Sequence, residues 1–165
     1  MSQILLVIGA LLFLIVLWGM TYGQMLAGDR REVMASGDVL RDIFETVHDT
    51  LPYLIQSIQD SKTEVATPIV ALRRQMYDVE GLEEKLSAYG RIEEWFEEIC
   101  GTEKKSLRED SGFLESVQEL KGWDDKLHTA LKTYNARVRV YEERREKFPG
   151  KLVAALCKMR SLREL

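Results

Sequence analysis

The sequence predicts an all-α protein: an N-terminal transmembrane helix, then an elongated antiparallel three-helix bundle with a short C-terminal helix. Three observations lead to this prediction. Residues 1–28 contain no Asp, Glu, Lys or Arg. After Val39 the apolar residues recur at the three- and four-residue steps of one helical face, and an amphipathic tail follows Phe-Pro-Gly at 148–150. We therefore divide the chain into an N-terminal anchor, residues 1–28, and a helical bundle, residues 29–165.

The anchor is the uncharged apolar run at residues 4–22. At ~1.5 Å per residue this run reaches about 28 Å, close to the thickness of a bilayer core. A cleaved signal peptide is the alternative, but it requires a basic start, a shorter apolar core and small residues before the cleavage site. The best cleavage position, after Ala27, has Met25 where a small residue belongs. We expect a retained anchor whose partner is the lipid bilayer.

The charges around the anchor predict its orientation. Arg30 and Arg31 are the first basic residues after the apolar run, and no charged side chain precedes it. By the positive-inside rule the N-terminus lies outside and the body lies in the cytoplasm. Trp18 and Tyr22 fit the aromatic belt at the cytoplasmic interface.

Composition and cysteine spacing exclude several classes of function. The net charge is −4 and no dense basic stripe occurs, so we expect no nucleic acid as a partner. Cys100 and Cys157 share no metal-ligand spacing and suit a reducing compartment. No nucleophile and base are arranged as in an enzyme, so we expect no enzymatic activity, no cofactor and no small-molecule substrate.

The body begins with two predicted helices. The first follows the apolar stripe from Val39, and Pro52 inside it predicts a kink or a local loss of hydrogen bonding. The second helix continues the same stepping from Val65 to Ile99, with Gly81 loosening its middle.

The third predicted helix starts at Ser111 and carries a regular heptad seam with one polar member, Asp124. The seam residues are Phe113, Val117, Leu120, Asp124, Leu127, Leu131, Tyr134, Val138 and Tyr141. Asn135 flanks this seam, and we expect it to fix the register through a hydrogen bond.

The end of the third helix raises the question of where the tail lies. Phe148 before Pro149 requires extended geometry and ends the helix. Three helices running up, down and up would place residue 150 about 45 to 55 Å from the bilayer. The tail, residues 150–165, then either packs on the far end of the bundle or docks a partner. If it packs, we expect Phe148 to be buried at the hinge.

A recurring pattern links the third helix to a known family. It is Tyr-Asn, a spaced Val and Tyr, Phe-Pro and an apolar end, at Tyr134, Asn135, Val138, Tyr141, Phe148, Pro149, Leu152 and Ala154. This pattern resembles the C-terminal signature of the LemA family of bacterial membrane proteins. Upstream, Leu51, Pro52, Leu54 and Ile55 resemble the Ile-Pro-Asn-Leu-Val run of that family.

The stretch before Pro52 departs from the family pattern, because it lacks the usual Trp and the Lys-Arg pair. The resemblance is thus to a divergent member. It implies a single-pass protein of the bacterial cytoplasmic membrane with its N-terminus outside and a helical bundle in the cytoplasm.

Two residue pairs raise the alternative of a metal site. Glu45 and His48 form ExxH on the first helix, and Asp125 and His128 form DxxH on the third. Bundles that hold two iron ions use two ExxH pairs and two further glutamates. Here both carboxylates fall outside the apolar seams and a fourth ligand helix is missing, so we expect no metal site. A metal-binding bundle or metal-dependent enzyme using His48 and His128 remains the alternative.

Two further clusters raise the question of partners. In the anchor, Gly19, Gly23 and Ala27 have the small-xxx-small spacing of associating helices, which keeps a membrane-organising homo-oligomer as another alternative. Near the end of the second helix four acidic residues repel each other: Glu93, Glu94, Glu97 and Glu98. Either the loop cations or a basic partner surface would offset them; these cations are Lys104, Lys105 and Arg108.

The sequence therefore favours a membrane-anchored scaffold or adaptor. Its helical bundle would present a coiled-coil-like cytoplasmic surface to protein partners that the sequence does not identify.

Overall fold

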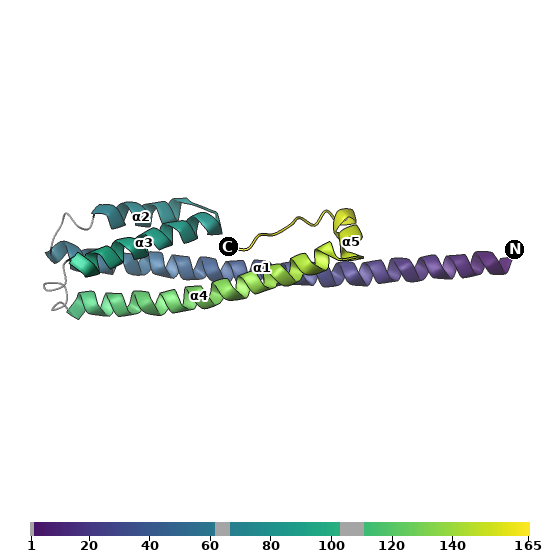
Figure 1. Cartoon of the computed structure of the whole chain (residues 1–165), viewed down its shortest axis with the longest axis horizontal. Coiled ribbons are helices and arrows are strands. Elements are labelled where there is room, and N and C mark those ends of the chain that lie inside the picture. Colours follow the sequence, from purple (N-terminus) through teal and green to yellow (C-terminus); the bar gives the residue numbers. More distant parts are fainter. Residues whose placement is uncertain (1, 62–66, 103–110) are drawn as a thin grey trace. The chain divides into compact units, whose positions relative to one another are not determined.

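All regular elements in the described chain are α-helices (Figure 1). The computed structural model describes residues 2–61, 67–102 and 111–165. The helices are α1 (Ser2–Ser61), α2 (Thr67–Asp78), α3 (Leu82–Thr102), α4 (Ser111–Glu146) and α5 (Gly150–Leu156). Over these residues the predicted all-α class is confirmed. The chain forms two compact units: residues 1–36 with 132–164 are the first unit, and residues 37–131 with 165 are the second unit.

Helix α1 passes through the predicted domain boundary at residue 28 without a break. Its apolar residues from Ile4 to Met20 are exposed. Among the described helices, α1 alone is long and apolar enough to cross a membrane by length and composition. The division into an anchor, 1–28, and a bundle, 29–165, stays a prediction.

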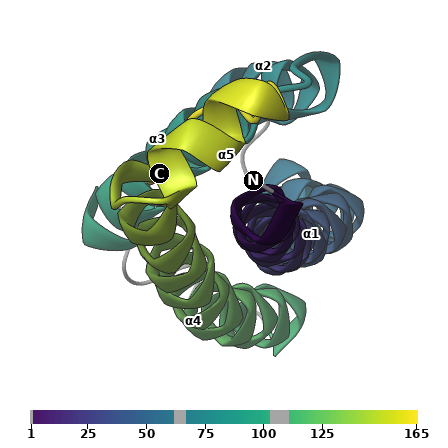
Figure 2. The ribbon, with the colours of Figure 1, turned by 90° about the vertical axis from the view of Figure 1, so that its right-hand side faces the viewer.

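The prediction of one continuous second helix is wrong, because residues 79–81 separate α2 from α3. Lys85 makes two hydrogen bonds at this turn. The backbone N–H of Lys85 donates to the Gly81 carbonyl at 3.0 Å, and Lys85 Nζ donates to the Met76 carbonyl at 3.0 Å. The ammonium group of Lys85, a residue of α3, thus lies at the C-terminal end of α2, where a positive charge suits the helix dipole of α2. The two helices consequently lie side by side (Figure 1 and Figure 2).

The predicted stripes form the core of the second unit. Val39, where the α1 stripe was placed to begin, is exposed, but the described stripe residues after it are buried: Leu40, Ile43, Phe44, Val47, Leu51, Leu54 and Ile55. Aromatic rings join the helices, because the centroids of Phe44 and Tyr89 lie 6.3 Å apart and those of Phe96 and Phe113 lie 6.1 Å apart. The part of the α4 seam that lies in this unit, from Phe113 to Leu131, is buried or half-buried throughout, Asp124 included. The break between α2 and α3 therefore changes the number of helices but not the faces they bury.

Pro52 does not end α1, which continues to Ser61. A proline has no N–H, so the carbonyl four residues earlier, on His48, loses its usual partner in the helix. The guanidinium of Arg73 on α2 supplies the replacement, because its Nε donates to the His48 carbonyl at 3.1 Å. The expected local loss of helix hydrogen bonding is thereby offset by a contact between helices.

The tail does not lie where the sequence placed it. In the first unit α4 runs antiparallel to α1: Arg137 bonds to Glu32 and Ser36, whereas Arg144, later in α4, bonds to Asp29, earlier in α1. A Cβ atom at Gly23 would lie 3.5 Å from Val153 Cγ1 in α5. The expectation of a distal residue 150 is wrong, because within the first unit the end of α4 and α5 contact Tyr22 and Gly23, at the end of the apolar run.

The hydrogen bond from Arg73 to the His48 carbonyl gives a testable prediction. Arg73→Ala should lower the free energy of unfolding by about 1 to 3 kcal/mol, because it leaves a half-buried carbonyl without a partner. In a Pro52→Ala background the restored N–H can serve that carbonyl, and the loss from Arg73→Ala should shrink by about 1 kcal/mol. Urea unfolding in detergent, followed by circular dichroism, measures both.

Arg74→Ala is the matched control. Its side chain is exposed and lies 3.7 Å from Asp78 on the same helix, so its removal should change stability by less than about 0.5 kcal/mol. If Arg73→Ala lowers the free energy of unfolding equally with Pro52 and with Pro52→Ala, then Arg73 does not replace the hydrogen bond that Pro52 removes.

Candidate functional site

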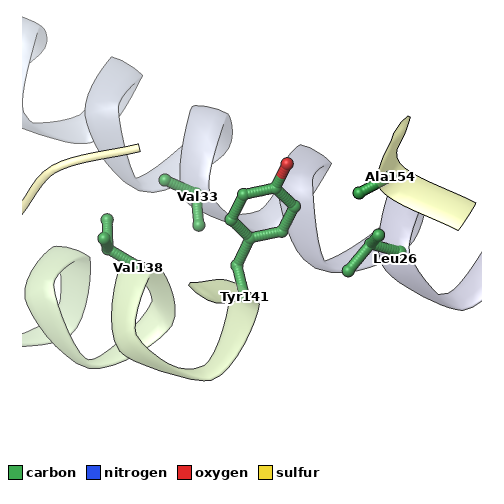
Figure 3. Close-up of a cluster of buried hydrophobic side chains, with 5 residues drawn as sticks. All are labelled: Leu26, Val33, Val138, Tyr141 and Ala154. Carbon is green, nitrogen blue, oxygen red and sulfur yellow. The ribbon is translucent and has the colours of Figure 1, made fainter. Parts of the chain in front are cut away.

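The first unit is built around a small buried cluster (Figure 3). Its members are Leu26 and Val33 from α1, Val138 and Tyr141 from α4, and Ala154 from α5. The ring of Tyr141 is fully buried and lies between the two α1 side chains. We call residues 22–36 of α1 together with residues 132–164 the tail module.

Arg144 makes the main polar contacts between α1 and α4 in the tail module. Its Nη1 donates to both carboxylate oxygens of Asp29, at 2.7 and 2.8 Å. Its carbonyl oxygen, in the last turn of α4, accepts a hydrogen bond from the Tyr22 hydroxyl at 3.0 Å. Two turns earlier, Arg137 donates to the Glu32 carbonyl at 3.0 Å and to Ser36 Oγ at 2.6 Å. The register of α4 on α1 is therefore set by side chain to main chain bonds as well as by packing.

Gly150 is required where α4 turns into α5. A Cβ atom at this position would overlap the carbonyl of Arg144, a backbone group that cannot move aside. Only glycine permits this close approach of the turn to the end of α4.

The residues after α5 return along α4. The Tyr141 hydroxyl donates to the Arg160 carbonyl at 2.9 Å, and the N–H of Leu162 donates to Glu142 Oε1 at 2.6 Å. Arg139 pairs with Glu164 at 3.0 Å, and this hydrogen bond lowers the pKa of Glu164. Burial raises the pKa of Tyr141. The tail, left open between packing and docking, is thus packed.

A groove of about 440 Å³ lies beside these contacts in the first unit. It is lined by Asp29, Glu32, Lys132, Thr133, Ala136, Arg137 and Val140. Both charge signs are present, and the side chain of Val140 is exposed at the surface. Such a lining suits a protein segment with polar and apolar groups better than a small apolar ligand.

The histidine pairs do not meet in the described chain. His48 lies in a hollow of about 350 Å³ with Glu45 and Asp49. Its ring packs on Tyr77 with centroids 5.2 Å apart, and its Nδ1 lies 3.1 Å from Asp49 Oδ1. Asp125 and His128 are exposed on α4 and do not line this hollow.

Among the side chains that the structure describes, those of residues 3–56, 68–98 and 111–165, no group of three His, Cys, Asp or Glu is placed to hold a metal ion. The metal alternative therefore gains no support from the geometry.

An acidic cluster in the second unit joins α3 to α4. Burial, a hydrogen bond with Asp124, and the charges of Asp124 and Glu97 together raise the pKa of Glu93 from 4.5 to about 7. Burial, together with the negative charges of Glu93 and Asp124, raises the pKa of Tyr89. The polar seam residue Asp124 thus faces an acid of the neighbouring helix. The predicted counter-charges Lys104, Lys105 and Arg108 lie outside the described residues.

The small residues of the anchor have different surroundings. Nothing lies within 4 Å of a Cβ atom at Gly19, whereas Gly23 is already packed by Val153 of the same chain. Self-association through Gly19, Gly23 and Ala27 stays a prediction, as does the register role of Asn135, which is half-buried on α4. Cys157 is exposed after α5, and the side chain of Cys100 is outside the described residues.

These features define a class: an all-α protein with one long apolar N-terminal helix, held by a C-terminal module that returns to that helix. The family model of the LemA family matches residues 43–164, so the chain belongs to the LemA family. No curated protein and no solved structure gives a match. The resemblance found in the sequence is confirmed. Four of the signature residues lie in or against the buried cluster of the tail module: Tyr134, Val138, Tyr141 and Ala154.

Several residues of the tail module were missed by sequence reasoning. The sequence patterns assigned no contact to Arg137 and Arg144 of α4 or to Asp29 and Glu32 of α1. One signal was available, because Asp29 and Glu32 are the earliest acids in the chain and the last turns of α4, residues 137–145, contain four arginines. That pattern alone does not identify the pairs.

The tail module predicts unequal roles for two aromatic residues. Tyr141→Ala should cost about 3 to 5 kcal/mol of unfolding free energy, because it empties a buried site. Phe148 is 75% exposed, so the sequence-based prediction of its burial is wrong. Phe148→Ala should change the stability by less than about 1 kcal/mol. Urea unfolding of the full chain in detergent compares the two, and equal losses would contradict this structure of the tail.

The acidic cluster predicts a pH dependence. The pKa of Glu93 is raised in the folded state, so its contribution to stability is fully present below pH 4.5 and is lost as pH rises through about 7. Glu93→Gln should flatten this decline and should raise the melting temperature at pH 8. Glu94→Gln, an exposed neighbour on α3, is the control and should leave the decline intact. Parallel melting curves for wild type and Glu93→Gln at all pH values would count against the cluster.

Proposed function

We propose that the protein is a membrane-anchored helical scaffold or adaptor. Residues 4–22 cross the bacterial cytoplasmic membrane with the N-terminus outside. The body, residues 29–165, then lies in the cytoplasm and presents helical surfaces to protein partners.

The exposure of the apolar side of α1 is the observation that carries the proposal. Its large apolar residues from Ile4 to Met20 are between 45% and 73% exposed. Water-soluble monomers rarely expose a contiguous apolar surface of this size, whereas a bilayer provides its natural environment. Membership of the membrane-associated LemA family agrees with this reading. The orientation rests on Arg30 and Arg31, which follow the apolar run.

The groove of the tail module is the surface that we propose for a protein partner. It begins at Asp29, which is about 10 Å beyond Tyr22 along a helix. A partner held there would be kept close to the membrane. The exposed charges of Glu32 and Lys132 and the exposed Val140 could all contact a bound segment.

Photocrosslinking in cells tests the scaffold. With p-benzoylphenylalanine at Val140, a discrete adduct with another protein should form, because this side chain is exposed in the groove. The same group at Glu143, which is exposed on α4 but does not line the groove, should give no such adduct. Lys132→Glu should reduce the Val140 adduct severalfold by reversing a charge of the groove.

The identified partner must also bind the purified full chain, and that binding must weaken in the Lys132→Glu variant. Adducts of equal yield from Val140 and Glu143 would refute a specific surface. Orientation is checked separately by alkaline phosphatase fused after Leu165, which should be inactive. An active fusion would place the body outside the cytoplasm and overturn the topology.

A further inference from the structure

Helix α5 and the turn before it have two unlike sides. Val153 and Ala154 face the core of the tail module and are only 8% and 4% exposed. Phe148, Leu152 and Leu156 recur every four residues and are 75%, 58% and 83% exposed. Each of these three apolar side chains therefore lies largely outside the core.

This exposed apolar side lies next to the end of the apolar run of α1. The ring of Phe148 is 6.2 Å from that of Trp18, centroid to centroid. Trp18 also neighbours Tyr22 at 6.4 Å, and Tyr22 bonds to the last turn of α4. Trp and Tyr at the end of an apolar run occupy the membrane–water interface. Within the first unit, Phe148 is therefore at the level where residues 4–22 would leave the bilayer.

The charge of the same segment is one-sided. Residues 147–163 contain five Lys or Arg and no Asp or Glu. Their basic side chains, those of Lys147, Lys151, Lys158, Arg160 and Arg163, belong to exposed residues. Basic residues beside an apolar side are typical of helices that lie in the interface of anionic membranes.

We propose that Phe148, Leu152 and Leu156 insert into the headgroup–acyl boundary of an anionic membrane leaflet, beside the point where α1 leaves it. Three of the basic residues, Lys147, Lys151 and Lys158, lie in or next to α5 and then contact the lipid phosphates. This inference rests on the proposed membrane anchoring, and it makes the tail module a second membrane contact that limits the tilt of α1. The continuity of the apolar side with the end of the anchor favours lipid over a protein partner.

Lipid quenching tests the insertion in the full chain. In a Cys100→Ser, Cys157→Ser background, single cysteines at Leu152, Leu14 and Val140 are labelled with the environment-sensitive dye NBD. The protein is placed in vesicles of phosphatidylglycerol and phosphatidylcholine with brominated acyl chains. Labels at Leu14 and Leu152 should be quenched about twofold, and the label at Val140, two turns before Phe148 on α4, should not.

The anionic component gives a second readout. Quenching at Leu152 should weaken in pure phosphatidylcholine and in the Lys151→Glu, Lys158→Glu variant, whereas quenching at Leu14 should not change. Quenching at Leu14 without quenching at Leu152 would overturn the insertion and leave the anchor standing. No quenching at Leu14 would overturn both. A blue-shifted but unquenched label at Leu152 would mean that a second copy or another protein covers this side, which also overturns the proposal.

Discussion

The carbonyl oxygen of Arg144 is the point on which the structure of the first unit depends. It accepts the Tyr22 hydroxyl from α1, and it lies so close to the next turn that only Gly150 fits there. The guanidinium of the same residue holds Asp29. One residue therefore fixes the end of α4, the start of α5 and the register of both on α1. These bonds also satisfy polar groups in the last turn of a helix, where main-chain carbonyls lack partners within the helix.

In the second unit too, side chains bond to main-chain carbonyls that have no partner within their own helix. The reversal between α2 and α3 is stabilised by Lys85, which serves a carbonyl at the end of α2. The gap that Pro52 leaves in α1 is filled by Arg73 of α2. In both places a long cationic side chain supplies a donor that the main chain does not. The position of α2 is thereby specified by polar contacts in addition to the apolar stripes, which by themselves would allow several arrangements.

These contacts give the family signature a physical meaning. Tyr141 is buried and donates to the returning tail, while Val138 and Ala154 fill the cluster around it. Phe148 and Leu152 belong to the same signature but point away from the core. The signature thus has an inner part, which holds the tail module together, and an outer part, which is exposed. In the proposed scaffold, this arrangement would keep the proposed partner groove and the proposed membrane contact in one unit.

The sequence by itself determined the all-helical class, the apolar N-terminal run and the faces that each helix buries. These features follow from local periodicity and from runs of uncharged residues, which do not depend on distant parts of the chain. The tertiary structure alone decided that the chain turns at residues 79–81, that the tail returns to Gly23, and that Glu93 meets Asp124. The turn at residues 79–81 contains no proline, so the sequence there indicates a helix end only weakly. A reversal that is missed at this point gives every later residue the wrong neighbours. The exposure of Phe148 and the pairing of Arg144 with Asp29 could not be read from spacing, because both depend on which helix lies opposite.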